Sequence, residues 1–120
     1  MNARRQVLSQ IVACLAALSL PALAQQERRV RRIAYLSSGS LKADTGRLGA
    51  FRAGMAELRW VEGRDYVIDA RYANGVVQAL GELAAELLTA QPDMLLVPGD
   101  SVVRVLAQRT RTIPIVFVTA

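Results

Sequence analysis

Two short loops carry the residues of this chain that are best suited to bind a ligand. Each loop follows an apolar run typical of a buried strand and consists mainly of serine and glycine. Small residues let backbone amides approach an anion such as a carboxylate, and the start of a helix adds a favourable dipole. We predict a ligand site formed by these loops and the end of a further strand: Ser37, Ser38, Gly39 and Ser40; Gly99, Asp100 and Ser101; and Thr119.

The same residue types also serve as helix N-caps, so part of this set has an alternative role. Ser40, Asp100 and Ser101 stand where helices are expected to begin, and serine and aspartate are preferred N-cap residues. Capping and ligand contact can coexist at these positions. Ser37 and Ser38 stand at a strand end, where ligand contact is the favoured interpretation.

Other kinds of site lack the residues they need. The chain has no histidine, and its one cysteine, Cys14, lies within the first 24 residues. Disulfides, thiolate catalysis, Ser-His catalysis and Cys/His metal sites are therefore excluded from the rest of the chain. The loop 37–42 has too few glycines for a nucleotide-phosphate motif. Asp65 and Asp69 are flanked by arginines, so a solvated sheet edge explains them better than a catalytic pair. We expect no enzymatic activity and no cofactor.

The elements that must position these loops alternate between strands and helices. Apolar runs bounded by turn residues predict strands at 33–36, 66–72, 94–97 and 112–118. Apolar residues at three- and four-residue steps predict helices at about 43–60, at 80–88 and, starting after Ser101, through Val103 and Leu106. The strand 66–72 alternates polar and apolar residues, which suits a sheet edge. This order implies right-handed crossovers and an α/β fold, a Rossmann-like parallel sheet with flanking helices.

The N-terminus has the composition of a secretory signal peptide. Arg4 and Arg5 precede an apolar run over 7–20, which is too short to span a membrane, and small residues precede Gln25. We expect residues 1–24 to be removed by cleavage after Ala24 and the mature chain to be periplasmic. A twin-arginine signal and a lipoprotein box at Cys14 are the alternatives to an ordinary leader.

Most of the positive charge left after that cleavage lies at the new N-terminus. The remaining 96 residues carry a net charge of +3, to which Arg28, Arg29, Arg31 and Arg32 contribute. No aromatic residues interleave with these arginines, so they indicate a solvated lead-in to the first strand rather than a nucleic-acid contact. We expect no nucleic-acid partner.

Three segments carry a resemblance to a family of transport proteins: Arg32–Ser37, Leu58–Ala73 and Thr112–Phe117. In their order and spacing they resemble the ABC-transporter substrate-binding proteins of the tryptophan/tyrosine-binding type. The resemblance implies a type I periplasmic binding protein, whose two Rossmann-like lobes close on a small ligand such as an amino acid and deliver it to an ABC permease in the inner membrane. It also implies that residues 25–120 form only a partial N-terminal lobe.

Two departures from the family pattern bear on the site and on stability. Asp100 stands where relatives usually have glycine or threonine, and its charge would oppose a ligand carboxylate or attract an ammonium group. Arg59 stands where relatives tend to have glycine, at a position suited to left-handed backbone geometry. The aromatic residues are expected to pack rather than to form a ligand box: Tyr35, Trp60, Tyr66, Tyr72 and Phe117.

Two other functions remain as alternatives, a truncated envelope enzyme with a flavodoxin-like domain and a fragment with no activity. The last apolar strand is expected to need further neighbours, so we expect the chain alone to be marginally stable or prone to aggregate.

Overall fold

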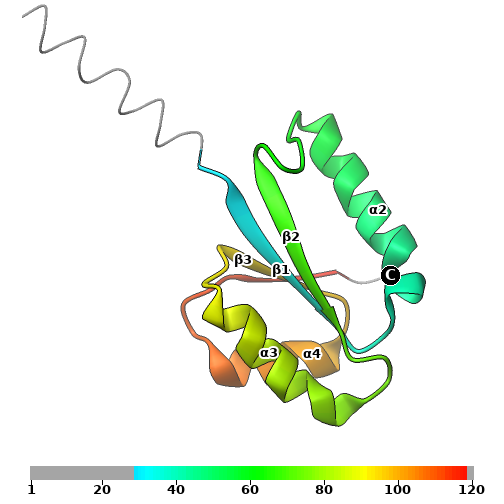
Figure 1. Cartoon of the computed structure of the whole chain (residues 1–120), viewed down its shortest axis with the longest axis vertical. Helices are drawn as coiled ribbons and strands as arrows, with labels where there is room; N and C mark the ends of the chain where they lie inside the picture. The colour runs from blue at the N-terminus through cyan, green and yellow to red at the C-terminus, as the bar shows by residue number, and fades with distance from the viewer. Residues whose placement is uncertain (1–28, 119–120) are drawn as a thin grey trace, which may run out of the picture.

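The computed structural model describes residues 29–118, and its centre is a sheet of four parallel strands. The strands are β1 (Arg31–Ser37), β2 (Tyr66–Tyr72), β3 (Met94–Val97) and β4 (Ile115–Phe117). They lie in the order β2-β1-β3-β4 (Figure 1). β2 therefore lies at an edge of the described sheet, as its alternating sequence predicts, and the expected α/β fold is confirmed.

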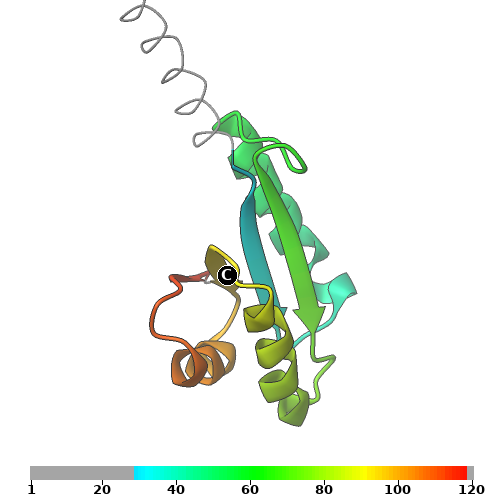
Figure 2. The ribbon, with the colours of Figure 1, turned by 60° about the vertical axis from the view of Figure 1, so that its left-hand side comes forward.

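Three α-helices and one short 3₁₀ helix connect the strands. They are α2 (Leu41–Glu57), η1 (Val77–Ala79), α3 (Leu80–Thr89) and α4 (Asp100–Arg109). α2 covers one face of the sheet, and α3 and α4 cover the other (Figures 1 and 2). This division follows from right-handed crossovers, because the chain moves in one direction from β1 to β2 and in the opposite direction from β2 through β3 to β4.

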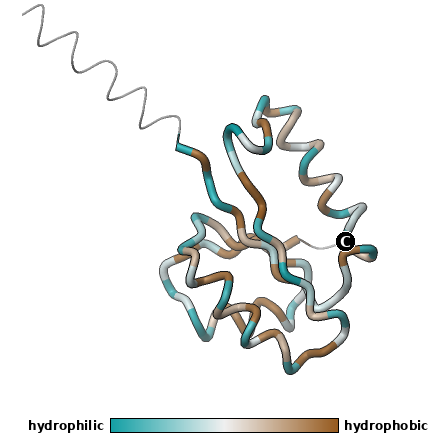
Figure 3. The backbone as a smooth tube through the Cα atoms, viewed as in Figure 1, coloured by the Kyte–Doolittle hydropathy of each residue, from teal (hydrophilic) through white to brown (hydrophobic). Residues whose placement is uncertain are grey.

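The strands supply two hydrophobic clusters, one on each face. Ala34 and Leu36 of β1 face α3 and α4, whereas Ile33 and Tyr35 face α2, as the two-residue period of a strand requires. The cluster under α3 and α4 is the larger one. Polar and apolar residues are mixed along α2 (Figure 3); Leu48 is its one buried apolar residue, and Phe51 and Met55 are partly buried on the same cluster. α2 is therefore attached to the sheet by little apolar surface.

Some boundaries differ from the sequence prediction. The first helix begins at Leu41 and ends at Glu57, where a turn takes over, instead of running from 43 to 60. The last strand is limited to Ile115–Phe117, because residues 112 and 113 form a bend and Pro114 has no N–H to donate. The turn at Asn74 and Gly75 leads from a strand into a helix, as predicted.

Candidate functional site

The loops after β1 and β3 lie at the same edge of the sheet, on neighbouring strands. Tyr35 pairs with Leu96, so the carboxyl ends of the two strands are side by side. The helix that follows β1 covers one face and the helix that follows β3 covers the other. This is the topological switch point of the sheet, where open α/β proteins bind ligands. The structure thus brings together Ser37 to Ser40 and Gly99 to Ser101, while Thr119 lies outside the described residues, as does the leader 1–24.

The β1–α2 loop is held by the turn that follows β2. Three successive carbonyl oxygens of the loop accept hydrogen bonds from three successive N–H groups of the turn. The pairs are Ala73 N–H to Ser37 O at 2.9 Å, Asn74 N–H to Gly39 O at 2.9 Å and Gly75 N–H to Ser38 O at 2.8 Å. Asn74 and Gly75 reach these positions with φ of +51° and +82°. The loop therefore has a defined shape.

The serines of this loop have different roles. The Ser37 side chain is buried, and its Oγ accepts a hydrogen bond from the Gly39 N–H at 3.0 Å. Ser40 is the N-cap of α2, because its Oγ accepts from the Ala43 N–H at 3.1 Å. The capping interpretation of Ser40 is thus confirmed. Ser38 and Gly39 are half-buried.

The capping interpretation is wrong for Asp100 and Ser101. The N-cap of α4 is Gly99, with φ of +130°, and no side chain caps this helix. Glycine takes this backbone conformation without the steric cost that a side chain would impose, so the helix begins directly after it. Asp100 and Ser101 are the first two helical residues and are exposed. Their N–H groups belong to the first turn, whose N–H groups have no acceptor within the helix.

Asp44, on the first turn of α2, is a candidate site residue that the sequence analysis did not single out. It is only 3% exposed, and its Oδ1 accepts a hydrogen bond from Arg47 Nη1 at 2.6 Å. Its Oδ2 is buried without a hydrogen-bond partner among the described residues. An acidic residue in a first helical turn usually favours the helix dipole from the surface. The burial of Asp44 depends on the strands and the loop beside it, so the sequence alone does not indicate it.

Two tyrosines lie close to this carboxylate. Burial raises the pKa of Tyr35 to about 12; Arg47 acts against this rise and Asp44 adds to it. Burial also raises the pKa of Tyr72, and the charge of Asp44 contributes. Both phenols are therefore neutral at ordinary pH. The Tyr35 hydroxyl, like Asp44 Oδ2, has no hydrogen-bond partner among residues 29–118.

A cavity of about 470 Å³ lies beside α2 and not at the two loops. Its walls include Tyr35, Arg47, Phe51, Leu96 and Val118. A smaller cavity, of about 170 Å³, lies near the start of β1 and the end of α3, and Arg32 and Asp69 are among its lining residues. Neither cavity is lined by a residue of the predicted ligand loops.

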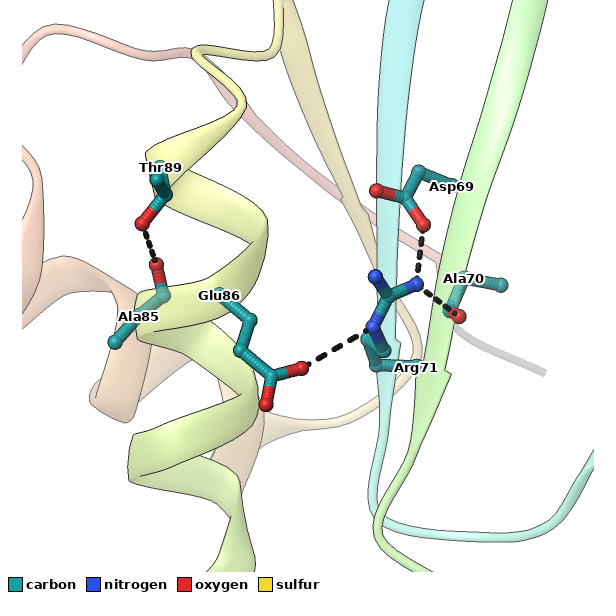
Figure 4. A network of polar contacts seen from close by, with 6 residues as sticks. All are labelled: Asp69, Ala70, Arg71, Ala85, Glu86 and Thr89. Carbon is teal, nitrogen blue, oxygen red and sulfur yellow. Dashed lines mark hydrogen bonds and ion pairs between the residues drawn. The ribbon is translucent and has the colours of Figure 1, made fainter.

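The carboxylates near β2 form ion pairs, as their arginine neighbours predict. Asp69 pairs with Arg71, which also contacts Glu86 at 3.3 Å (Figure 4). Asp65 pairs with Arg64 at 2.8 Å, and this contact lowers the pKa of Asp65. No group of three acidic, His or Cys residues within residues 29–118 is arranged to hold a metal ion. No helix in that range is both long and apolar enough to cross a membrane.

Comparison with known proteins identifies the fold. No family model and no curated protein matches the chain. A conserved domain protein from Vibrio cholerae O1 biovar El Tor strain N16961 has a similar structure, with a TM-score of 0.67 and 22% identity; the match covers 74% of this chain and 30% of that one. A second solved structure that is similar to this chain is the ligand-free, open structure of CD0873, a substrate-binding protein with adhesive properties from Clostridium difficile. It has a TM-score of 0.67 and 15% identity, over 76% of this chain and 31% of that one.

This chain therefore has an α/β fold similar to that of a substrate-binding protein. It spans about three tenths of the length of each of the two solved chains.

Proposed function

We propose that this chain is part of the first lobe of an extracytoplasmic solute-binding protein that serves an ABC importer. The observation that carries the proposal is the meeting of two serine- and glycine-containing loops at the switch point of a sheet whose fold is similar to that of a substrate-binding protein. Substrate-binding proteins close around a small molecule by a hinge motion. The role is binding and delivery, without catalysis.

The proposed ligand is an amino acid, which offers a carboxylate to the first turn of α4. The N–H groups of Asp100 and Ser101 precede the first intrahelical bond, which runs from the Val103 N–H to the Gly99 oxygen at 3.3 Å. They are available as donors to an anion, and the helix dipole has the favourable sign. Ser38 and Gly39 provide small residues on the neighbouring loop. The ligand class comes from the family resemblance, which these donors support.

We propose further that the chain is exported from the cytoplasm. The leader 1–24 has the composition of a signal peptide, and its removal would place the rest of the chain in the periplasm, where a permease of the inner membrane would be its partner.

The test is titration of the ¹⁵N-labelled protein with individual amino acids, followed by NMR. Ligand binding is expected to shift the amide signals of residues 38–40 and 99–101 together. Ser101→Ala removes a hydroxyl beside the proposed carboxylate position and is expected to weaken binding about three- to tenfold. Thr89→Ala is the matched control, because the Thr89 hydroxyl bonds to Ala85 O on α3 (Figure 4). Saturation without shifts in either loop would contradict the proposed site.

A further inference from the structure

Gly39 lies directly beside the unpartnered oxygen of Asp44. A Cβ at Gly39 would lie 3.4 Å from Ser37 Oγ and 3.9 Å from Asp44 Oδ2, without a clash. Gly39 does not have positive φ, so its backbone does not require glycine. The missing side chain leaves a small space, next to both oxygens, on the half-buried loop that the proposed function assigns to ligand contact.

Asp44 Oδ2 is a strong acceptor with an unused lone pair. Buried carboxylate oxygens are nearly always hydrogen-bonded, because an unpaired buried charge is costly. Arg47 satisfies Oδ1 only. The Gly39 space adjoins this oxygen, so a donor arriving through it would reach Oδ2. The Tyr35 hydroxyl, which also lacks a partner among the described residues, is the competing donor within the chain.

We propose that Asp44 is a specificity-determining residue that accepts a hydrogen bond from a primary ammonium group of the ligand, which enters past Gly39. The proposal rests on the proposed function and adds which ligand group this loop recognises. An ammonium group is compact and offers three donors, so it suits a narrow approach to one carboxylate oxygen. Entry requires a small displacement of the Gly39 segment, since Oδ2 is closed to solvent in this conformation.

The position of Asp44 makes it better suited than Asp100 to this task. Asp100 is exposed on the first turn of α4. A charge in contact with water is screened, and its attraction for a ligand cation is weak. Asp44 acts in a less polar environment, where a charge-assisted hydrogen bond is strong. The proposal thus assigns the carboxylate of an amino acid to the α4 N-terminus and its ammonium group to Asp44.

The experiment compares amino acids with analogues that lack only the amino group. The probes are L-phenylalanine with 3-phenylpropanoate, and L-leucine with 4-methylpentanoate, each titrated by NMR into the wild-type protein and its variants. The wild type is expected to bind the amino acids at least about tenfold more tightly than the analogues. Asp44→Asn is expected to remove this preference by weakening amino-acid binding about tenfold, with little change for the analogues.

Gly39→Ala provides a second variant that keeps the Asp44–Arg47 pair. A methyl group at this position fits without a clash and fills the approach to Oδ2, so the same selective loss is expected. Gly49→Ala is the matched control: Gly49 is an exposed residue of α2 with nothing within 4 Å of the added methyl, and it is expected to retain the preference.

The outcomes separate the two proposals. Full retention of the amino-acid preference by folded Asp44→Asn and Gly39→Ala would overturn the role of Asp44 and leave solute binding in place. Equal weakening for amino acids and analogues would overturn it as well, because Asp44 would then act only on the structure of the loop. Failure of the wild type to bind any of the four probes would overturn both proposals for this ligand class.

Discussion

At the scale of single residues, Arg59 occupies a backbone conformation that favours glycine. Its φ is +63°, its N–H donates to Ala56 O at 2.9 Å, and the N–H of Trp60 donates to Met55 O at 2.9 Å. These two bonds form a Schellman motif, whose left-handed residue is usually glycine. The sequence prediction of left-handed geometry at Arg59 is thus confirmed.

Arg59→Gly is therefore expected to stabilise the protein by about 0.5–1 kcal/mol, because it removes the steric cost of the left-handed conformation while the unfolded chain gains some entropy. The measurement is the free energy of unfolding in urea. Gly63→Ala is the reverse control, since Gly63 has φ of +90° and the variant should lose stability. Unchanged or lower stability of Arg59→Gly would show that the arginine side chain compensates for its backbone strain.

The buried phenol of Tyr35 predicts a pH dependence at the alkaline end. Burial raises its pKa from 10.0 to about 12, so the unfolded chain releases this proton at lower pH than the folded chain does. Its contribution to stability is therefore complete below pH 10.0 and is lost as the pH rises towards about 12. Tyr35→Phe should reduce the loss of stability over this range, measured by urea unfolding at several pH values. Tyrosinate absorbance in the folded protein gives an independent check, and ionisation of all three tyrosines near their ordinary pKa would contradict the prediction.

At the scale of elements, α2 is attached to the sheet through Leu48, its one buried apolar side chain, with Phe51 and Met55 partly buried beside it. Leu48 packs with Tyr35, Tyr66 and Leu96 on the α2 face of the sheet. Leu48→Ala should destabilise the protein by about 3 kcal/mol, because it removes buried methyl groups and leaves a cavity. Leu58→Ala is the matched control: Leu58 is 71% exposed and its truncation should cost less than about 0.5 kcal/mol. Hydrogen exchange is expected to show that the α2 amides lose protection first in Leu48→Ala; uniform loss over all elements would mean that α2 is not the weakly attached part.

Local sequence signals predict some of these elements correctly and misplace the boundaries of others. The strands at 66–72 and 94–97 were predicted with the boundaries that the structure has, because short apolar or alternating runs between turn residues are local signals. The start of α4 was misplaced because the unusual φ of Gly99, and not a side-chain cap, determines it. The last strand is shorter than predicted because Pro114 has no backbone N–H to donate to a neighbouring strand. Asp44 was missed because its neighbours include Tyr35 of β1 and Tyr72 of β2, which only the folded sheet brings to the first turn of α2.

At the scale of the whole molecule, the sheet formed by residues 29–118 has unlike edges. β2 has charged residues, and its Asp69 and Arg71 pair with each other, which discourages association with another strand. β4 has none, and its Val116 and Phe117 are 42% and 43% exposed. An exposed apolar edge of this kind promotes association between chains.

We therefore expect the 120-residue chain, when purified alone, to self-associate through β4. Val116→Lys places a charge on this edge and should shift the chain towards monomer, as measured by sedimentation at several protein concentrations. Val76→Lys is the matched control: Val76 is 51% exposed in the loop after β2, so the same added charge at that site should leave association nearly unchanged. Equal solubilisation by both variants would mean that net charge, and not the β4 edge, governs association. A monomeric wild type with cooperative unfolding would instead mean that the two apolar clusters on either side of the sheet stabilise the chain despite its exposed edge.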